Sequence, residues 1–84
     1  MANPVRIFTL STCSHCKAVK KFLTEIDVPY DFTDVDLLSG DERKAALTEV
    51  AKYNPNRTFP TLLIGDRVVI GFSEKKIREA LGLT

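Results

Sequence analysis

Apolar and polar residues follow different spacings in successive stretches of the first half of the chain. Residues 5–10 are apolar at all but two positions, which is typical of a buried strand. Residues 13–26 carry apolar side chains at helical spacing, and Ser11 and Thr12 before them are common helix-initiating residues. Residues 30–35 alternate loosely between apolar and polar, so we predict a second strand after the helix.

The second half begins with a helix-start pattern at residues 39–42, in which Ser39 and Glu42 have the spacing of a capping box. This pattern predicts a helix that continues to Tyr53. The sequence Asn-Pro-Asn at residues 54–56 then breaks the helical periodicity.

The last part of the chain predicts a hairpin and a final helix. Residues 61–64 and 68–71 are short apolar stretches on either side of the turn sequence Gly-Asp-Arg at 65–67. Ser73 is in place to cap a helix after the hairpin, and Gly82 is in place to end it.

The predicted order of elements is strand, helix, strand, helix, strand, strand, helix (βαβαββα), which is an α/β arrangement. The first two strands are joined through a helix and should lie parallel, whereas the hairpin adds antiparallel neighbours. We expect a small mixed four-stranded sheet with three helices flanking its two faces. A chain of 84 residues without a repeat or linker fits one domain over residues 1–84.

Charge and composition exclude some classes of function. The formal net charge is +1, whereas nucleic-acid-binding proteins usually carry a clear basic excess, so we expect no nucleic-acid partner. The N-terminal residues contain no apolar run long enough for a signal peptide or a membrane span. We therefore expect a cytoplasmic protein with no membrane partner.

The only two cysteines, Cys13 and Cys16, stand at the start of the first predicted helix. This spacing puts both sulfurs on one helical turn, and a disulfide that closes so small a loop adds little stability. In a reducing compartment such a pair is more often catalytic or redox-sensing than structural. Helix N–H groups and the helix dipole favour a thiolate, so we expect a depressed pKa and nucleophilic attack at Cys13. Cys16 should be more shielded and should resolve the mixed disulfide.

The only histidine, His15, lies between the two cysteines. A partly protonated imidazole there would stabilise the Cys13 thiolate and raise the reduction potential of the pair. The alternative is an exposed residue in a solvent-facing turn. Structural zinc sites need about four ligands, so we expect no metal site within one chain, while an iron–sulfur cluster shared between two chains stays open.

Lysines follow the cysteines along the first helix. Lys17 would add positive potential near the sulfurs. We expect Lys20 and Lys21 to form a solvated helix face.

The first strand, the motif Thr-Cys-Ser-His-Cys at residues 12–16 and the motif Arg-Thr-Phe-Pro-Thr at 57–61 together resemble the glutaredoxin family, which has the thioredoxin fold. The resemblance covers nearly the whole chain. Phe59 stands where the family usually has Val, and the sequence Gly-Phe-Ser-Glu at 71–74 is similar to the turn before the family's last helix. The resemblance implies a dithiol oxidoreductase that reduces protein disulfides or glutathione mixed disulfides.

The same resemblance implies a substrate site on these two segments. It implies a cis Phe59–Pro60 bond beside the Cys13 sulfur, where the Phe59 backbone pairs with an extended substrate; the alternative is a proline that starts an edge strand. Arg57 would meet one carboxylate of glutathione, and N–H groups after Gly71 would cap the other. The residues implied in substrate binding are Arg57, Thr58, Phe59, Pro60, Gly71, Phe72 and Ser73.

Departures from the family pattern bear on the reductant. Ser14 and His15 replace the usual Pro and aromatic residue, Leu10 replaces a Lys, and Ser73 and Glu74 replace an Asp pair that helps to hold glutathione. The pattern also resembles glutaredoxin-like electron donors that thioredoxin reductase reduces. We expect a monomer with no tightly bound cofactor, which acts on disulfide-containing proteins and uses glutathione as co-substrate or thioredoxin reductase as reductant. An iron–sulfur cluster carrier is the alternative function.

Overall fold

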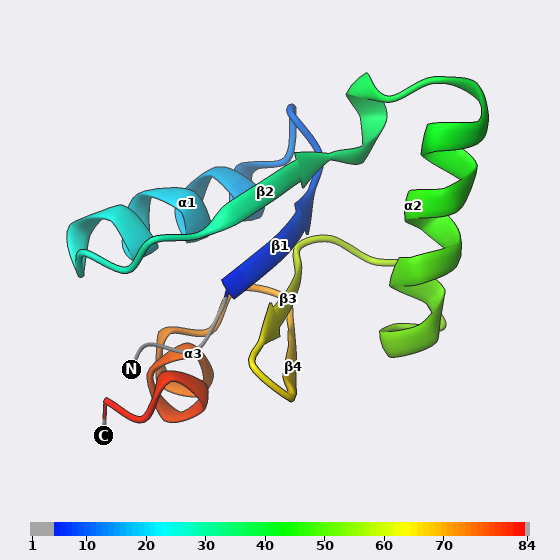
Figure 1. Cartoon of the computed structure of the whole chain (residues 1–84). Coiled ribbons are helices and arrows are strands. Elements are labelled where there is room, and N and C mark those ends of the chain that lie inside the picture. The colour runs from blue at the N-terminus through cyan, green and yellow to red at the C-terminus, as the bar shows by residue number, and fades with distance from the viewer. Residues whose placement is uncertain (1–4, 84) are drawn as a thin grey trace.

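A four-stranded mixed sheet forms the centre of the molecule (Figure 1). The computed structural model describes residues 5–83. The strands are β1 (Val5–Thr9), β2 (Asp31–Asp34), β3 (Thr61–Ile64) and β4 (Arg67–Ile70), in the spatial order β2-β1-β3-β4. β1 lies parallel to β2 and antiparallel to β3, and β3 and β4 form the antiparallel hairpin. The predicted thioredoxin-like α/β fold is therefore confirmed.

Helices cover both faces of this sheet. They are α1 (Ser14–Glu25), α2 (Gly40–Tyr53) and α3 (Glu74–Leu81), with a short 3₁₀ helix, η1 (Val35–Leu37), after β2. Figure 1 shows α1 and α3 on one side of the sheet and α2 on the other. No helix within residues 5–83 is long and apolar enough to cross a membrane.

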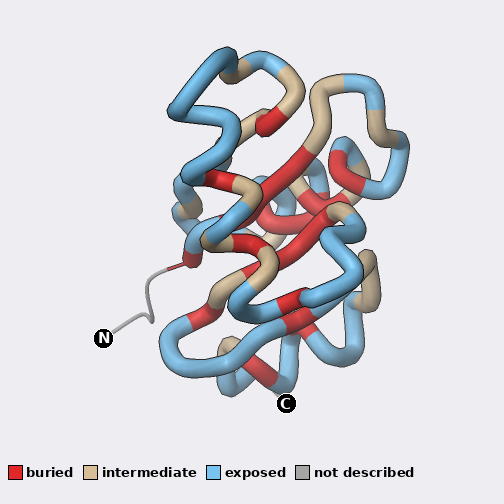
Figure 2. The backbone as a smooth tube through the Cα atoms, turned by 90° about the vertical axis from the view of Figure 1, so that its right-hand side faces the viewer, coloured by how far each residue is buried: buried red, intermediate tan, exposed pale blue. Residues whose placement is uncertain are grey.

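Each face of the sheet has its own hydrophobic cluster. Because successive side chains of a strand point to opposite faces, Ile7 of β1 packs with α1 and α3, whereas Phe8 packs with α2. Figure 2 shows buried parts of the chain in the interior and exposed parts around them. The first cluster comprises Val5, Ile7, Val19, Phe22, Leu23, Leu62, Ile64, Val69, Ile77 and Ala80. The second comprises Phe8, Val35, Ala46 and Val50.

Two helix starts differ from the sequence prediction. The first helix begins at Ser14 rather than Cys13, with Cys13 itself as the N-cap, so Ser11 and Thr12 form a turn before it. Ser39 is the N-cap of α2 as predicted, but its side chain makes no capping hydrogen bond. Gly40 has φ 57, which turns the backbone away from the regular first turn that a capping box needs.

The end of the chain follows the prediction closely. The hairpin register pairs Ile64 with Arg67, so β4 begins one residue earlier than predicted. Ser73 caps α3 by accepting a hydrogen bond from the Lys76 amide, and Gly82 ends the helix in the left-handed conformation.

Candidate active site

The cysteine loop connects β1 to α1 and ends with Cys13 as the helix N-cap. The Cys13 sulfur accepts a hydrogen bond from the Cys16 amide, with an N-to-S distance of 3.3 Å. The Cys13 amide in turn donates to the Leu10 carbonyl at 3.1 Å, which closes the turn before the helix. The thiol thus takes the position that a hydroxyl or carboxylate usually occupies, among the unpaired N–H groups of the first helical turn.

The two cysteines differ in burial. Cys13 is partly exposed, whereas Cys16 is fully buried on the inner side of α1. The Leu10 amide lies 3.4 Å from the Cys16 sulfur and donates to it. The prediction that Cys16 is the more shielded thiol is confirmed.

Their pKa values shift in opposite directions. Partial burial acts to raise the pKa of Cys13, but donation from the Cys16 thiol and from the amides of Cys16 and His15 outweighs it and lowers the pKa. Burial raises the pKa of Cys16 to about 12, helped by its hydrogen bond to Cys13 and by the charge of Cys13. The arrangement favours a thiolate at Cys13 and a thiol at Cys16, and only the thiolate is a strong nucleophile.

A carboxylate from η1 holds the loop that leads into Cys13. Asp36 accepts hydrogen bonds from the Ser11 amide at 2.8 Å and from the Ser11 hydroxyl at 2.5 Å. Arg43 of α2 donates to the carbonyls of Asp36 and Val35, which fixes η1 in turn. The pattern of apolar positions did not predict these contacts.

The segment before β3 is shaped by a buried asparagine. The Asn54 side-chain amide donates to the Thr58 carbonyl at 3.0 Å, to the Thr58 hydroxyl at 2.8 Å and to the Thr61 hydroxyl at 3.2 Å. The Phe59–Pro60 peptide bond is cis. Phe59 packs against the same hydrophobic cluster as Leu10, the residue that precedes the cysteine loop.

The turn before α3 is hydrogen-bonded to the segment that contains the cis proline. The Gly71 amide donates to the Pro60 carbonyl at 2.9 Å. Phe72 meets Phe22 of α1 edge to face, with 6.0 Å between ring centroids. Of the residues expected in the substrate site, those at 58–60 and 71–73 therefore lie on connected segments.

Three polar residues near the cysteines differ in their exposure to solvent. His15 is exposed at the start of α1. The prediction that Lys20 belongs to a solvated face is wrong, because its side chain is only 23% exposed and its ammonium lies 3.0 Å from Asp34. Lys21 is 80% exposed, as predicted.

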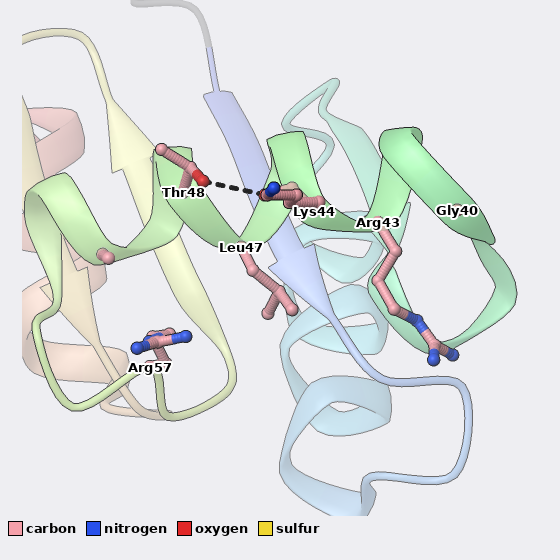
Figure 3. Close-up of a pocket in the computed structure, with 7 residues that line it drawn as sticks. Gly40, Arg43, Lys44, Leu47, Thr48 and Arg57 are labelled. Atoms are coloured by element: carbon pink, nitrogen blue, oxygen red, sulfur yellow. Dashed lines mark hydrogen bonds between the residues drawn. The ribbon is translucent and has the colours of Figure 1, made fainter.

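A basic groove of about 450 Å³ runs along one side of α2. Figure 3 shows Arg43 and Arg57 on the same side of this helix with Leu47 between them. Leu47 also packs against the cluster that Leu10 and Phe59 contact. The groove is lined by Gly40, Arg43, Lys44, Leu47, Thr48, Ala51 and Arg57.

Within residues 5–83, no three or more His, Cys, Asp or Glu side chains are grouped so that they could hold a metal ion.

Comparisons with known proteins agree with one another. A family model described as Glutaredoxin matches residues 5–69. Glutaredoxin-2 of Schizosaccharomyces pombe is 33% identical over 98% of this chain and 74% of its own length. The crystal structure of Methanosarcina acetivorans methanoredoxin matches with a TM-score of 0.90 at 41% identity, covering 95% of this chain and 85% of that one. A buckwheat glutaredoxin–glutathione complex shares the fold, with a TM-score of 0.75 at 23% identity over 96% of this chain and 72% of that one.

A thioredoxin-like sheet with two thiols at the start of its first helix defines a class of enzyme, the thiol–disulfide oxidoreductases. The chain belongs to the glutaredoxin family within that class.

Several residues around the cysteines were not found from the sequence. Asp34 and Asp36 carry one usable signal, because they lie at and just after the carboxyl end of a strand parallel to β1 and so reach the edge where the cysteine loop begins. Asn54 carries no such signal, since an asparagine after a helix is equally typical of a helix stop.

The Asp36 clamp predicts a pH-dependent contribution to stability. Hydrogen bonds from the Ser11 hydroxyl and amide lower the pKa of Asp36, so folding favours its carboxylate. This stabilisation is complete above the usual pKa of an aspartate and is lost as the pH falls through the lowered pKa of the folded chain. We expect Asp36→Asn to be less stable than the parent near neutral pH and to converge with it in acid, measured by urea unfolding.

The matched control is Asp66→Asn, in the exposed turn between β3 and β4. It should not reproduce this convergence. A stability gap between the parent and Asp36→Asn that stays constant or widens as the pH falls would contradict the clamp.

Proposed function

We propose that the chain is a dithiol oxidoreductase that reduces protein disulfides or glutathione mixed disulfides. The observation that carries the proposal is the placement of the two thiols at the start of α1, with Cys13 partly exposed as the N-cap and Cys16 fully buried. Cys13 is accessible and held towards the thiolate, as an attacking group must be. Cys16 is buried and held as a thiol, so it does not compete for substrate in the first step.

The reaction then runs in two exchanges. The Cys13 thiolate attacks one sulfur of the substrate disulfide, the substrate S–S bond breaks, and the first thiolate leaves and takes up a proton. Cys16, on losing its proton, attacks the Cys13 sulfur of the mixed disulfide and releases the second substrate thiolate. The substrate gains two electrons, and the protein loses two as the Cys13–Cys16 disulfide forms.

Substrate docking is proposed at Phe59. Its backbone N–H and C=O make no backbone hydrogen bond within residues 5–83, whereas the neighbouring Thr58 carbonyl is occupied by Asn54 and Thr61. An extended peptide can pair with such a free backbone as an added strand. His15, exposed beside Cys13, is proposed to favour the thiolate through its imidazole.

Glutathione is the proposed small co-substrate. The tripeptide carries two carboxylates, and the basic groove offers Arg43, Lys44 and Arg57 on the side of the molecule where Leu10 and Phe59 pack. The Arg57 guanidinium makes no hydrogen bond or ion pair with another residue in the range 5–83, so it is free to pair with a carboxylate. The buckwheat glutaredoxin of the same fold was solved with glutathione.

One observation favours thioredoxin reductase as a second possible reductant. Leu10 stands where a lysine usually assists glutathione binding, and its side chain packs into the α2 cluster. That position therefore offers no cation to glutathione, and the basic groove must supply the charge alone.

The roles of the two thiols predict different defects. Cys13→Ser should abolish turnover of a model disulfide, because the attacking thiolate is gone. Cys16→Ser should still attack and should accumulate a mixed disulfide with its substrate, which intact-mass measurement detects. Full reductase activity in Cys13→Ser would contradict the assignment of Cys13 as the nucleophile.

The groove predicts how the protein is reduced. With NADPH as the electron source, turnover should be supported by glutathione with glutathione reductase. Arg57→Ala should raise the KM for a glutathione mixed disulfide by at least about tenfold, because a hydrogen bond to a charged group contributes about 1.5–3 kcal/mol.

The control for this assay is Lys52→Ala, an exposed lysine on α2 outside the groove, which should leave the KM unchanged. If turnover requires thioredoxin reductase, and neither glutathione nor the Arg57→Ala substitution changes it, glutathione is not the reductant.

A further inference from the structure

The ion pair between Lys20 and Asp34 is unusually covered for its position. Its two side chains are 23% and 13% exposed, whereas the pairs Arg6–Glu49 and Lys21–Glu25 are far more open to solvent. Exposed ion pairs contribute little to stability and are screened by salt, but a covered pair keeps its field. The Lys20–Asp34 pair therefore exerts a local electric field on the groups packed around it.

Cys16 is the group that this field reaches. Lys20 follows Cys16 by four residues in α1, so the two side chains start from the same face of the helix, one turn apart. The Asp34 carboxylate also accepts a hydrogen bond from the Thr9 hydroxyl at 2.5 Å. Thr9 is followed by Leu10, whose amide donates to the Cys16 sulfur. The ion pair thus adjoins Cys16 both along the helix and through the end of β1.

The ammonium is held in place from two directions. Asp34 of β2 binds it at 3.0 Å, and the ring of Phe32, also on β2, lies under it with 4.1 Å from Nζ to the ring centroid. A lysine on an open helix face would move freely, and its charge would be averaged by water. Here the charge has a fixed position, on a residue one helical turn beyond the resolving thiol.

We propose that Lys20, positioned by Asp34, sets how readily Cys16 gives up its proton in the second exchange and thereby sets the rate of resolution. This inference rests on the proposed function, in which Cys16 attacks the mixed disulfide. Lys20 acts through Cys16 and is a positioning residue, since nothing places it in contact with the substrate.

The charges around Cys16 determine the sign of the effect. Cys13 lies on the same helical turn, and Lys20 lies one turn later with Asp34 of β2 bound to it. Asp36 of η1 is bound to Ser11 instead. Once Cys13 is part of the mixed disulfide it carries no charge, so Lys20 is the charged side chain whose influence on Cys16 remains. The ammonium favours the Cys16 thiolate, and the carboxylate opposes it.

Because the two charges act in opposite directions on the Cys16 thiolate, removing each charge should change the rate of resolution in the opposite direction. In Lys20→Met the carboxylate is left without its partner, so resolution should slow at neutral pH and recover at higher pH. In Asp34→Asn the ammonium is no longer offset, so resolution should accelerate and its pH profile should move to lower pH. A change that lowers the thiolate fraction about tenfold also makes the remaining thiolate more nucleophilic, so the expected slowing is about threefold.

The measurement is a single-turnover reaction of the reduced full chain with an aromatic disulfide whose released thiolate is coloured. The first colour release reports attack by Cys13, and the second reports resolution by Cys16. Lys20→Met and Asp34→Asn should change only the second phase, in opposite directions, and Lys20→Arg should restore the parental rate. Lys21→Met is the matched control, because Lys21 is an exposed lysine on the same helix.

The outcomes separate this inference from the proposed function. If the parent chain shows no second release, the resolving role of Cys16 fails. If the parent resolves normally but both variants slow the second phase, or neither changes it, the Lys20–Asp34 pair is only structural and the inference fails. Asp34→Asn is nearly isosteric, so it decides the matter even if Lys20→Met does not fold.

Discussion

The hydrogen bond from the Cys16 amide to the Cys13 sulfur connects the fold of this chain to its chemistry. It makes Cys13 the N-cap of α1, so the reactive sulfur stands at the positive end of the helix dipole. The same helix turn carries Cys16 inward, where burial holds it as a thiol. One local constraint therefore produces two thiols with different tasks, separated by less than a turn of helix.

The parallel pairing of β1 and β2 places side chains of the β2 end next to this helix start. Because the two strands end at the same edge of the sheet, the chain after β2 passes beside the cysteine loop. Asp36 uses that position to hold Ser11 before Cys13, and Asp34 uses it to hold Lys20 beyond Cys16. Carboxylates from one short segment thus bind one residue before the dithiol and one residue after it, while α2 contributes Arg43 to keep the segment in place.

Local signals in the sequence were enough to predict the order of elements, the hairpin, the ends of α3 and the position of the two cysteines at the first helix. These features depend on helical spacing and turn residues, which near neighbours determine. Tertiary contacts decided the rest. Lys20 occupies a polar helix position that is solvated unless another strand provides a partner, and the alternation of β2 does not reveal that Asp34 is that partner. Ser11 was a candidate helix-initiating residue, but its side chain binds Asp36 and Cys13 is the N-cap.

The division of tasks between the two thiols is tested most directly by following each one through its own titration. NMR of isotope-labelled cysteine Cβ atoms in the reduced chain reports the pKa of Cys13 and of Cys16 separately. Cys13 should titrate below the range of an unperturbed cysteine, while Cys16 should remain protonated until the pH approaches its pKa of about 12. Equal pKa values, or a lower pKa at Cys16 than at Cys13, would contradict the account.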